Sequence, residues 1–172
     1  PNNPTGAAMT RDALEKVALV ARRNDLLVIS DEVYDRLVYG LEHVCVPSLP
    51  GMKERTVLLG GFSKGFAMTG WRIGYAAGPS EIIEAMMKVH QYTMLCAPVV
   101  AQMAAIEALR SGEEPIMEMV GEYDRRRRLM VRGLNQAGLV CSEPRGAFYA
   151  FPSIGATGLS SDEFAERLLI EE

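Results

Sequence analysis

Apolar residues recur at helical spacing near the start of the chain. The recurring positions are Leu14, Val17, Ala18 and Ala21. Their i, i+3, i+4, i+7 pattern predicts an amphipathic helix that ends near Asn24, and Thr10 stands where an N-cap hydroxyl is needed. A continuous apolar run at 26–30 follows and predicts a strand that is buried on both faces of a sheet. This order of helix and buried strand indicates an α/β layer.

Two further segments have the composition of strands. Residues 56–59 form a second apolar run, and residues 71–77 form a third, less apolar one. The connection at 34–55 contains Pro47 and Pro50, so we expect it to be mainly loop.

The second half of the chain is dominated by helical patterns. We expect helices at 80–92, at 98–112 and over the long stretch 115–137, which Gly138 ends. A helix of that length often connects two lobes. Short apolar runs at 139–142 and 147–151 predict strands of a small lobe, and a last helix is expected to begin at Ser161.

The bulk composition is that of an ordinary globular protein. The chain has 172 residues, of which 48% are hydrophobic, and a formal net charge of -4. These values argue against disorder and against nucleic acid as a partner. The one basic run, residues 125–128, lies beside Glu122 and Asp124 in a helical pattern, so we expect a solvated helix face. No stretch of the sequence reaches the length of a membrane-spanning helix, so we expect no membrane partner.

The three cysteines, Cys45, Cys96 and Cys141, are odd in number and far apart. They predict no disulfide framework and no metal site, and they fit a reducing cytoplasm. We expect them to be small buried residues. The chain opens at Pro1 without an initiator Met and closes in a helical pattern, so we also expect it to be a fragment.

Three polar residues stand near the ends of the predicted strands. Asp31 directly follows the strand at 26–30, Lys64 follows the strand at 56–59 across a Gly-containing turn, and Arg72 lies eight residues later. Ligands of open α/β sheets bind at the carboxyl ends of strands, so Asp31 and Lys64 could converge on one crevice. Taken singly, each residue also has an ordinary explanation as a surface or turn residue.

Three longer blocks of sequence are more specific. They are PNNPTG at 1–6, SDEVY at 30–34 and FSKGFAMTGWRIGY at 62–75. In order and spacing they resemble the signature blocks of the class I and II aminotransferases, which are enzymes of fold type I that depend on pyridoxal 5'-phosphate (PLP). The resemblance continues more weakly to residues 146–149 and so covers essentially the whole chain.

This resemblance implies a fold and a division into domains. Residues 1–110 would be the C-terminal part of a large PLP-binding domain, a three-layer α/β/α structure with a mixed, mostly parallel sheet. Residues 111–172 would be a connecting helix and the start of a small α+β domain. The family also implies a cytoplasmic homodimer whose substrates are amino acids and 2-oxo acids.

The resemblance also implies a catalytic residue. Lys64 would form the internal aldimine with PLP and then move a proton between the substrate and the cofactor during ping-pong transamination. Asp31 would keep the pyridine nitrogen protonated, which makes the ring an electron sink.

Four further residues would bind the cofactor. Asn3 and Tyr34 would hydrogen-bond the phenolic oxygen of the ring, whereas Arg72 and Ser63 would bind the phosphate. Position 61 is Gly where many members of the family carry a second phosphate-binding Ser. The family's phosphate loop, ring-stacking aromatic residue and carboxylate-binding arginine have no counterpart in this sequence, so we expect about half a site and little activity from the chain alone.

Other functions share these blocks. A PLP-dependent C–S lyase and an aminocyclopropane-carboxylate synthase-like enzyme have nearly the same signature sequences, and the loops that distinguish their substrates are mostly missing here. A third alternative is a non-catalytic PLP-sensing domain of a transcription regulator, which would bind the cofactor with the same residues.

Overall fold

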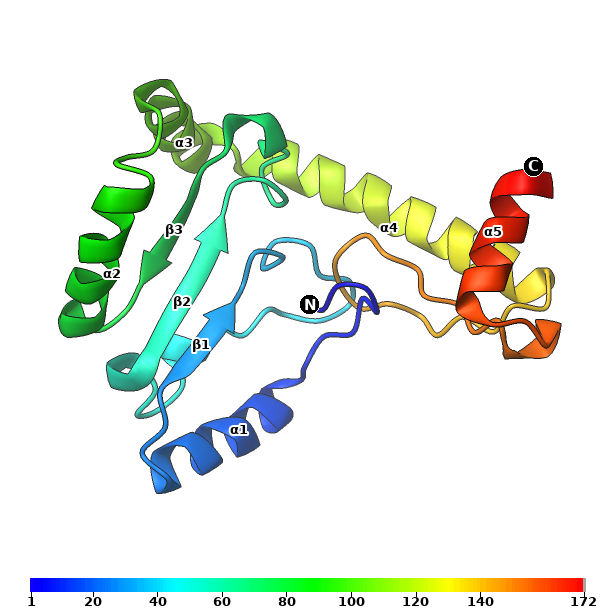
Figure 1. The fold of residues 1–172 in the computed structure, drawn as a ribbon, viewed down its shortest axis with the longest axis horizontal. Helices are drawn as coiled ribbons and strands as arrows, with labels where there is room; N and C mark the ends of the chain where they lie inside the picture. The colour runs from blue at the N-terminus through cyan, green and yellow to red at the C-terminus, as the bar shows by residue number, and fades with distance from the viewer. Residues whose placement is uncertain (172) are drawn as a thin grey trace.

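The computed structural model describes residues 1–171, and its centre is a three-stranded mixed sheet (Figure 1). The strands are β1 (Val28–Asp31), β2 (Thr56–Gly61) and β3 (Gly74–Ala77), in that order across the sheet. β1 pairs with β2 in parallel, and β2 pairs with β3 antiparallel. The predicted α/β class with a mixed sheet is confirmed, and all three strands overlap the segments that were predicted.

Helix α1 (Arg11–Arg23) begins where the sequence predicts, because the Thr10 hydroxyl accepts a hydrogen bond from the Ala13 amide at 3.3 Å. Its buried face contacts the loop between β1 and β2. The residues of this core cluster are Ala18, Ala21, Val44, Val46, Leu49 and Met52. The loop contains only two short 3-10 turns, Val46–Ser48 and Lys53–Arg55, which confirms that this connection is mainly loop.

Three helices follow the sheet: α2 (Ser80–Thr93), α3 (Val99–Ser111) and α4 (Glu113–Gln136). A last helix, α5 (Ser161–Glu171), follows an irregular segment. Ala105 of α3 packs on Phe62 and Met68, which belong to the segment between β2 and β3. Figure 1 shows α4 running from α3 across the molecule to the side where α5 lies. The four helices occur where the apolar spacing predicts them.

The strands predicted at 139–142 and 147–151 are wrong. Within the described chain, the only pairing there is an isolated bridge between Val38 and Gly146. The backbone amide of Ala147 donates to the Leu37 carbonyl at 2.8 Å, and Ala147 has a left-handed φ of 55°. An extended strand cannot pass through that conformation, so the segment bonds to the loop after β1 in place of a second sheet.

The burial predicted for β1 is also wrong, since the strand alternates between half-buried and exposed residues. Ile29 is 73% exposed. Strand side chains point to the two faces of the sheet, so the exposure of Ile29 means that this face of β1 is left uncovered by residues 1–171. Among these residues β1 is also an edge strand that pairs only with β2. Cys96 is likewise exposed, against expectation, although Cys141 is buried and Cys45 half-buried.

The arginine run lies on α4, and its four side chains pair with acidic residues of the same helix. Arg125 and Arg126 contact Glu122, whereas Arg127 and Arg128 contact Asp124. The predicted solvated face is confirmed for three of them. The exception is Arg127, which is 14% exposed, also pairs with Glu143, and lies over the Tyr39 ring at 5.1 Å.

No helix within residues 1–171 is both long enough and apolar enough to cross a membrane. The division into 1–110 and 111–172 falls at the junction of α3 and α4, which only Gly112 separates. That division stays a prediction.

Candidate functional site

The carboxyl ends of β1 and β2 lie side by side, because the two strands are parallel and Asp31 is in register with Leu59. Asp31 is the last residue of β1, and Lys64 follows the end of β2 by three residues. The structure thus places Asp31 and Lys64 at the same end of the sheet, as parallel pairing requires.

The turn that carries Lys64 has a defined shape. Phe62 is buried, and its backbone bonds to Ile73 and Met68 close the turn at 3.3 Å and 3.1 Å. The Lys64 side chain lies near the second half of the chain, with Nζ 5.5 Å from the centre of the Phe148 ring. Within the described residues, this ammonium group has no hydrogen bond or ion pair, so all three of its donors are available.

Ser63 and Arg72 belong to the same segment between β2 and β3. The Ser63 carbonyl accepts from the Thr69 hydroxyl at 3.0 Å, whereas the Ser63 side chain makes no hydrogen bond among residues 1–171. Arg72 is exposed, has a left-handed φ of 52°, and donates from one guanidinium nitrogen to the Thr69 carbonyl at 2.7 Å. The other N–H groups of Arg72 therefore remain free to bind an anion.

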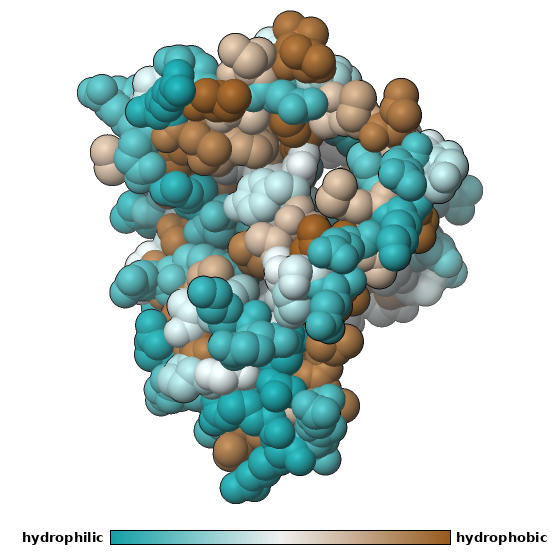
Figure 2. All heavy atoms as spheres, turned by 90° about the vertical axis from the view of Figure 1, so that its left-hand side faces the viewer, coloured by the Kyte–Doolittle hydropathy of each residue, from teal (hydrophilic) through white to brown (hydrophobic). Residues whose placement is uncertain are grey.

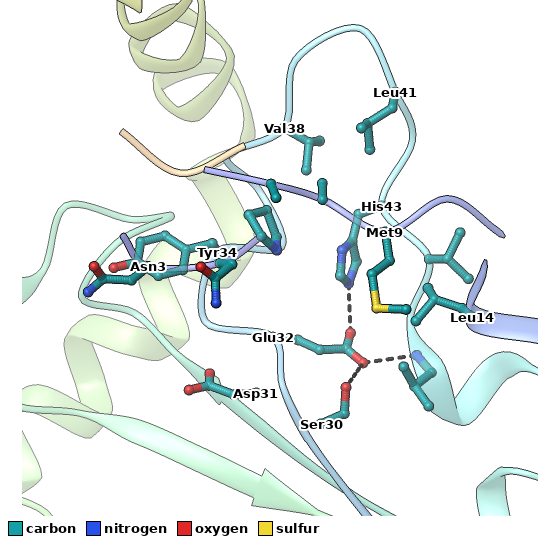
Figure 3. Close-up of a pocket in the computed structure, with 16 residues that line it drawn as sticks. Asn3, Met9, Leu14, Ser30, Asp31, Glu32, Tyr34, Val38, Leu41 and His43 are labelled. Atoms are coloured by element: carbon teal, nitrogen blue, oxygen red, sulfur yellow. Dashed lines mark hydrogen bonds and ion pairs between the residues drawn. The ribbon is translucent and has the colours of Figure 1, made fainter. Parts of the chain in front are cut away.

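Asn3, Asp31 and Tyr34 line one pocket of about 390 Å³ (Figure 3). In the close-up, Asn3, Tyr34 and Asp31 are all drawn on the side of the view opposite Met9 and Leu14. One carboxylate oxygen of Asp31 accepts from the Val33 amide at 3.1 Å. Ser63, Lys64 and Arg72 do not line this pocket. The structure thus brings three of the six predicted residues into one pocket, whereas the other three share the segment between β2 and β3.

Sequence reasoning missed a buried carboxylate in this pocket. Glu32 is 6% exposed and accepts hydrogen bonds from Ser30, His43 and the Val46 amide, at 2.9, 2.7 and 2.9 Å. Burial alone would raise the pKa of Glu32, but these hydrogen bonds outweigh it and hold the pKa below its ordinary value. The sequence carries only weak signals for this contact. Glu32 stands beside the end of a predicted strand, and His43 is one of only two histidines.

Tyr34 has a partner that the sequence did not indicate. Its hydroxyl oxygen lies 2.6 Å from that of Tyr149, which is 115 positions away in the chain. The pKa of Tyr34 lies well above its ordinary value, chiefly because the side chain is buried. The hydrogen bond with Tyr149, the charge of Tyr149 and the charge of Asp31 raise this pKa further. Tyr34 is therefore a protonated hydroxyl at neutral pH.

No group of three or more His, Cys, Asp or Glu side chains in the described chain is arranged to hold a metal ion.

Comparison with known proteins gives consistent matches. The family described as "Aminotransferase class I and II" matches residues 1–172. The Bacillus subtilis (strain 168) protein YugH, which is named as an aminotransferase, is 52% identical over 100% of this chain and 45% of its own length. An aspartate aminotransferase of Pyrococcus abyssi is 49% identical over 99% of this chain and 45% of its own length.

A solved structure agrees with these sequence matches. The crystal structure of an aromatic aminotransferase from Pyrococcus horikoshii OT3 has a TM-score of 0.95 and 48% identity, over 98% of this chain and 46% of that one. The chain thus spans about 45% of the length of the curated relatives it matches. Because the family match extends over every residue, the chain belongs to the class I and II aminotransferases.

Proposed function

We propose that the protein containing this chain is an amino-acid:2-oxo-acid aminotransferase that binds PLP at the carboxyl ends of β1 and β2. The observation that carries the proposal is the position of Asp31 and Lys64 at the ends of two adjacent parallel strands. In open α/β sheets this is where ligands bind.

The groups at this end of the sheet fit the needs of PLP. The cofactor requires an amine for its aldehyde, an acid for its ring nitrogen and donors for its phosphate. Lys64 offers an ammonium group without a partner among the described residues, and Asp31 has one carboxylate oxygen beyond its bond to Val33. Ser63 and Arg72 offer donors from one segment. The donor set therefore matches the cofactor group by group.

The residues of this chain would have distinct roles. Lys64 Nζ would hold the cofactor at its aldehyde carbon and, once released, remove the proton from the substrate Cα. Asp31 would bind the protonated ring nitrogen, while Arg72 and Ser63 bind the phosphate. Asn3 and Tyr34 would donate to the ring oxygen. When bound, PLP supplies an electron sink for the charge left at the substrate Cα.

The substrates are proposed as a class: an amino acid as amino donor and a 2-oxo acid as acceptor. Two of the relatives are named as aspartate and aromatic aminotransferases. Transamination is favoured over a lyase reaction or a sensor role because these relatives are named as aminotransferases.

Two properties of the whole protein are also proposed. A homodimer is supported by exposed apolar residues around the start of α3, where Tyr92, Leu95 and Val99 are 86%, 77% and 70% exposed. A cytoplasmic location is supported by the free thiols of Cys45, Cys96 and Cys141.

The first experiment is borohydride reduction of the full-length, PLP-loaded protein, followed by peptide mass mapping. We expect a pyridoxyl group on Lys64. The Lys64→Ala variant should lose the label and keep the melting temperature of the cofactor-free protein. Lys88→Ala, a matched change on exposed α2, should keep the label. A label on another lysine, or none on a folded protein, would contradict the proposal.

A second measurement separates the reaction types. Adding an amino acid should convert the visible absorption band of the bound cofactor, and adding a 2-oxo acid should restore it. Release of pyruvate and ammonia or sulfide, without that recovery, would indicate a lyase. Loading with PLP but no spectral change with any amino acid would indicate a sensor.

A further inference from the structure

The segment 144–149 is tied to the loop after β1 by its backbone. Gly146 donates to the Gly6 carbonyl at 2.9 Å, Ala147 donates to the Leu37 carbonyl at 2.8 Å, and Tyr39 donates to the Arg145 carbonyl at 2.9 Å. The Tyr39 hydroxyl also donates to the Ala147 carbonyl at 2.6 Å. In Figure 1 the N-terminal turn and this segment accordingly meet near the middle of the molecule.

Two residues of this segment, Gly146 and Ala147, restrict the conformation of its backbone. A Cβ atom at Gly146 would lie 2.3 Å from Pro1 Cγ and 2.9 Å from the Leu37 carbonyl oxygen. Ala147 is fully buried and has a left-handed φ. These constraints fix the direction in which the chain leaves position 147 and thereby place the next two side chains, Phe148 and Tyr149, against Tyr34.

The Tyr34 ring is enclosed by this contact. Its centre lies 5.7 Å from the Phe148 ring and 5.9 Å from the Tyr149 ring, both in edge-to-face orientation. The two tyrosine hydroxyls meet at 2.6 Å. A hydroxyl has one proton to donate and two lone pairs, so the bond between the two tyrosines can run in either direction. Once another acceptor takes the Tyr34 proton, Tyr149 can donate to the Tyr34 oxygen.

We propose that, when the cofactor is bound, Tyr149 acts as a positioning residue: it donates its hydroxyl proton to Tyr34 and thereby directs the Tyr34 proton to the ring oxygen of the cofactor. This inference rests on the proposed function, in which Tyr34 contacts that oxygen. The new element is that Tyr149, from the second half of the chain, orients the hydroxyl proton with which Tyr34 contacts the ring oxygen. The charge of Asp31 acts on Tyr34, and the Lys64 ammonium lies over the Phe148 ring, which contacts both tyrosines.

The test is a pH titration of the visible absorption band in the full-length, PLP-loaded protein. A donor to the ring oxygen withdraws negative charge from it, and this weakens the hold on the proton at the lysine–cofactor linkage. Tyr34→Phe should therefore raise the apparent pKa of that linkage. Tyr149→Phe should raise it in the same direction by a smaller amount, about 0.5 to 1 unit.

The double variant distinguishes positioning from packing. Because Tyr149 acts through Tyr34, the double variant should titrate like Tyr34→Phe alone. Tyr123→Phe is the matched control, since its ring also contacts Phe148, at 5.6 Å, but its hydroxyl does not bond to Tyr34. That variant should titrate like the unmodified protein. Phe keeps the ring in each case, so melting temperatures should confirm folding.

The outcomes separate this inference from the proposed function. A shift with Tyr34→Phe but none with Tyr149→Phe would overturn the role of Tyr149 and leave the proposed function intact. Additive shifts would also overturn it. No shift with Tyr34→Phe would overturn both this inference and the proposed contact of Tyr34. Failure of borohydride to label Lys64 would reject the cofactor site itself.

Discussion

Gly61 ends β2 three residues before Lys64, and its surroundings have room for a side chain. A Cβ atom there would lie 3.5 Å from Val33 Cγ2, an ordinary contact. Its cross-strand partner is different, because a Cβ atom at Gly74 would lie 2.9 Å from the Gly60 carbonyl oxygen, which is backbone and cannot turn away. Of this pair, Gly61 can therefore accept a side chain and Gly74 cannot.

We predict that Gly61→Ser increases PLP affinity about tenfold, because the hydroxyl would add a donor to the phosphate site at a position where the family often has Ser. Fluorescence titration of the full-length apoprotein would measure this. Gly61→Ala is the control for the backbone effect and should bind PLP like the unmodified protein. Equal affinities for the Ser and Ala variants would show that position 61 does not face the phosphate.

At the scale of elements, the loop between β1 and β2 is held by one buried side chain. Glu32 joins the end of β1 to His43 and to the amide of Val46 across 14 positions of sequence. The far part of this loop packs on α1 through Val44, Val46 and Met52. Glu32 thus connects the strand that carries Asp31 to the core beneath α1.

We predict that Glu32→Gln lowers the free energy of unfolding by about 2 kcal/mol, because it weakens hydrogen bonds to a buried carboxylate. Urea unfolding at pH 7 would measure this. Glu42→Gln changes an exposed carboxylate of the same loop and should leave the stability unchanged. If the two variants unfold alike, Glu32 does not anchor the loop.

The contribution of Glu32 to the free energy of unfolding should decrease at low pH. Its pKa in the folded protein lies below the ordinary value of 4.5. The stabilisation is therefore fully present above about pH 4.5 and is lost as the pH falls through the lower folded pKa. The difference between the unmodified protein and Glu32→Gln should narrow below that pH.

The start of α1 provides a second prediction at this scale. Thr10→Ala removes the hydroxyl that accepts from the Ala13 amide, which should cost about 1 kcal/mol of stability. Thr10→Ser keeps an accepting hydroxyl and should stay close to the unmodified protein. Thermal unfolding of both variants tests this. Equal losses for Ala and Ser would show that the cap is not formed.

At the scale of the whole molecule, large apolar side chains gather on the side where α2 and α3 lie. Figure 2 faces that side and shows hydrophobic groups concentrated toward its top, with hydrophilic groups over much of the rest. The most exposed include Met87, Val89, Tyr92, Leu95, Val99, Val100 and Met103. Exposed apolar area of this extent is typical of a surface that another segment of the protein or a partner covers.

We predict that the 172-residue chain by itself binds a hydrophobic dye such as anilinonaphthalene sulfonate and self-associates at micromolar concentration. The full-length protein should not bind the dye, and it should associate no further than the proposed homodimer, because the rest of the protein and the proposed partner subunit would cover these faces. Dye fluorescence and sedimentation velocity would measure both. A monomeric chain without dye binding would show that the exposed apolar side chains rearrange.

The local elements followed from the sequence because their signals are local. Thr10 and the spacing of Leu14, Val17 and Ala18 predict α1, and Gly138 ends the predicted long helix close to where α4 ends at Gln136. The family also followed from short blocks that are continuous in the chain. The strands expected after residue 138 did not form, because the conformation of that segment depends on its hydrogen bonds to distant residues such as Gly6 and Leu37.

What the sequence determined by itself was the helices, the three strands of the sheet, the family and the end of the sheet that carries Asp31 and Lys64. Only the tertiary structure decided the contact of Tyr149 with Tyr34, the burial of Glu32 on His43 and the exposure of Ile29. Helix caps and apolar periodicity act within a few residues of each other. Contacts across 115 positions depend on the packing of the folded chain, which no local pattern encodes.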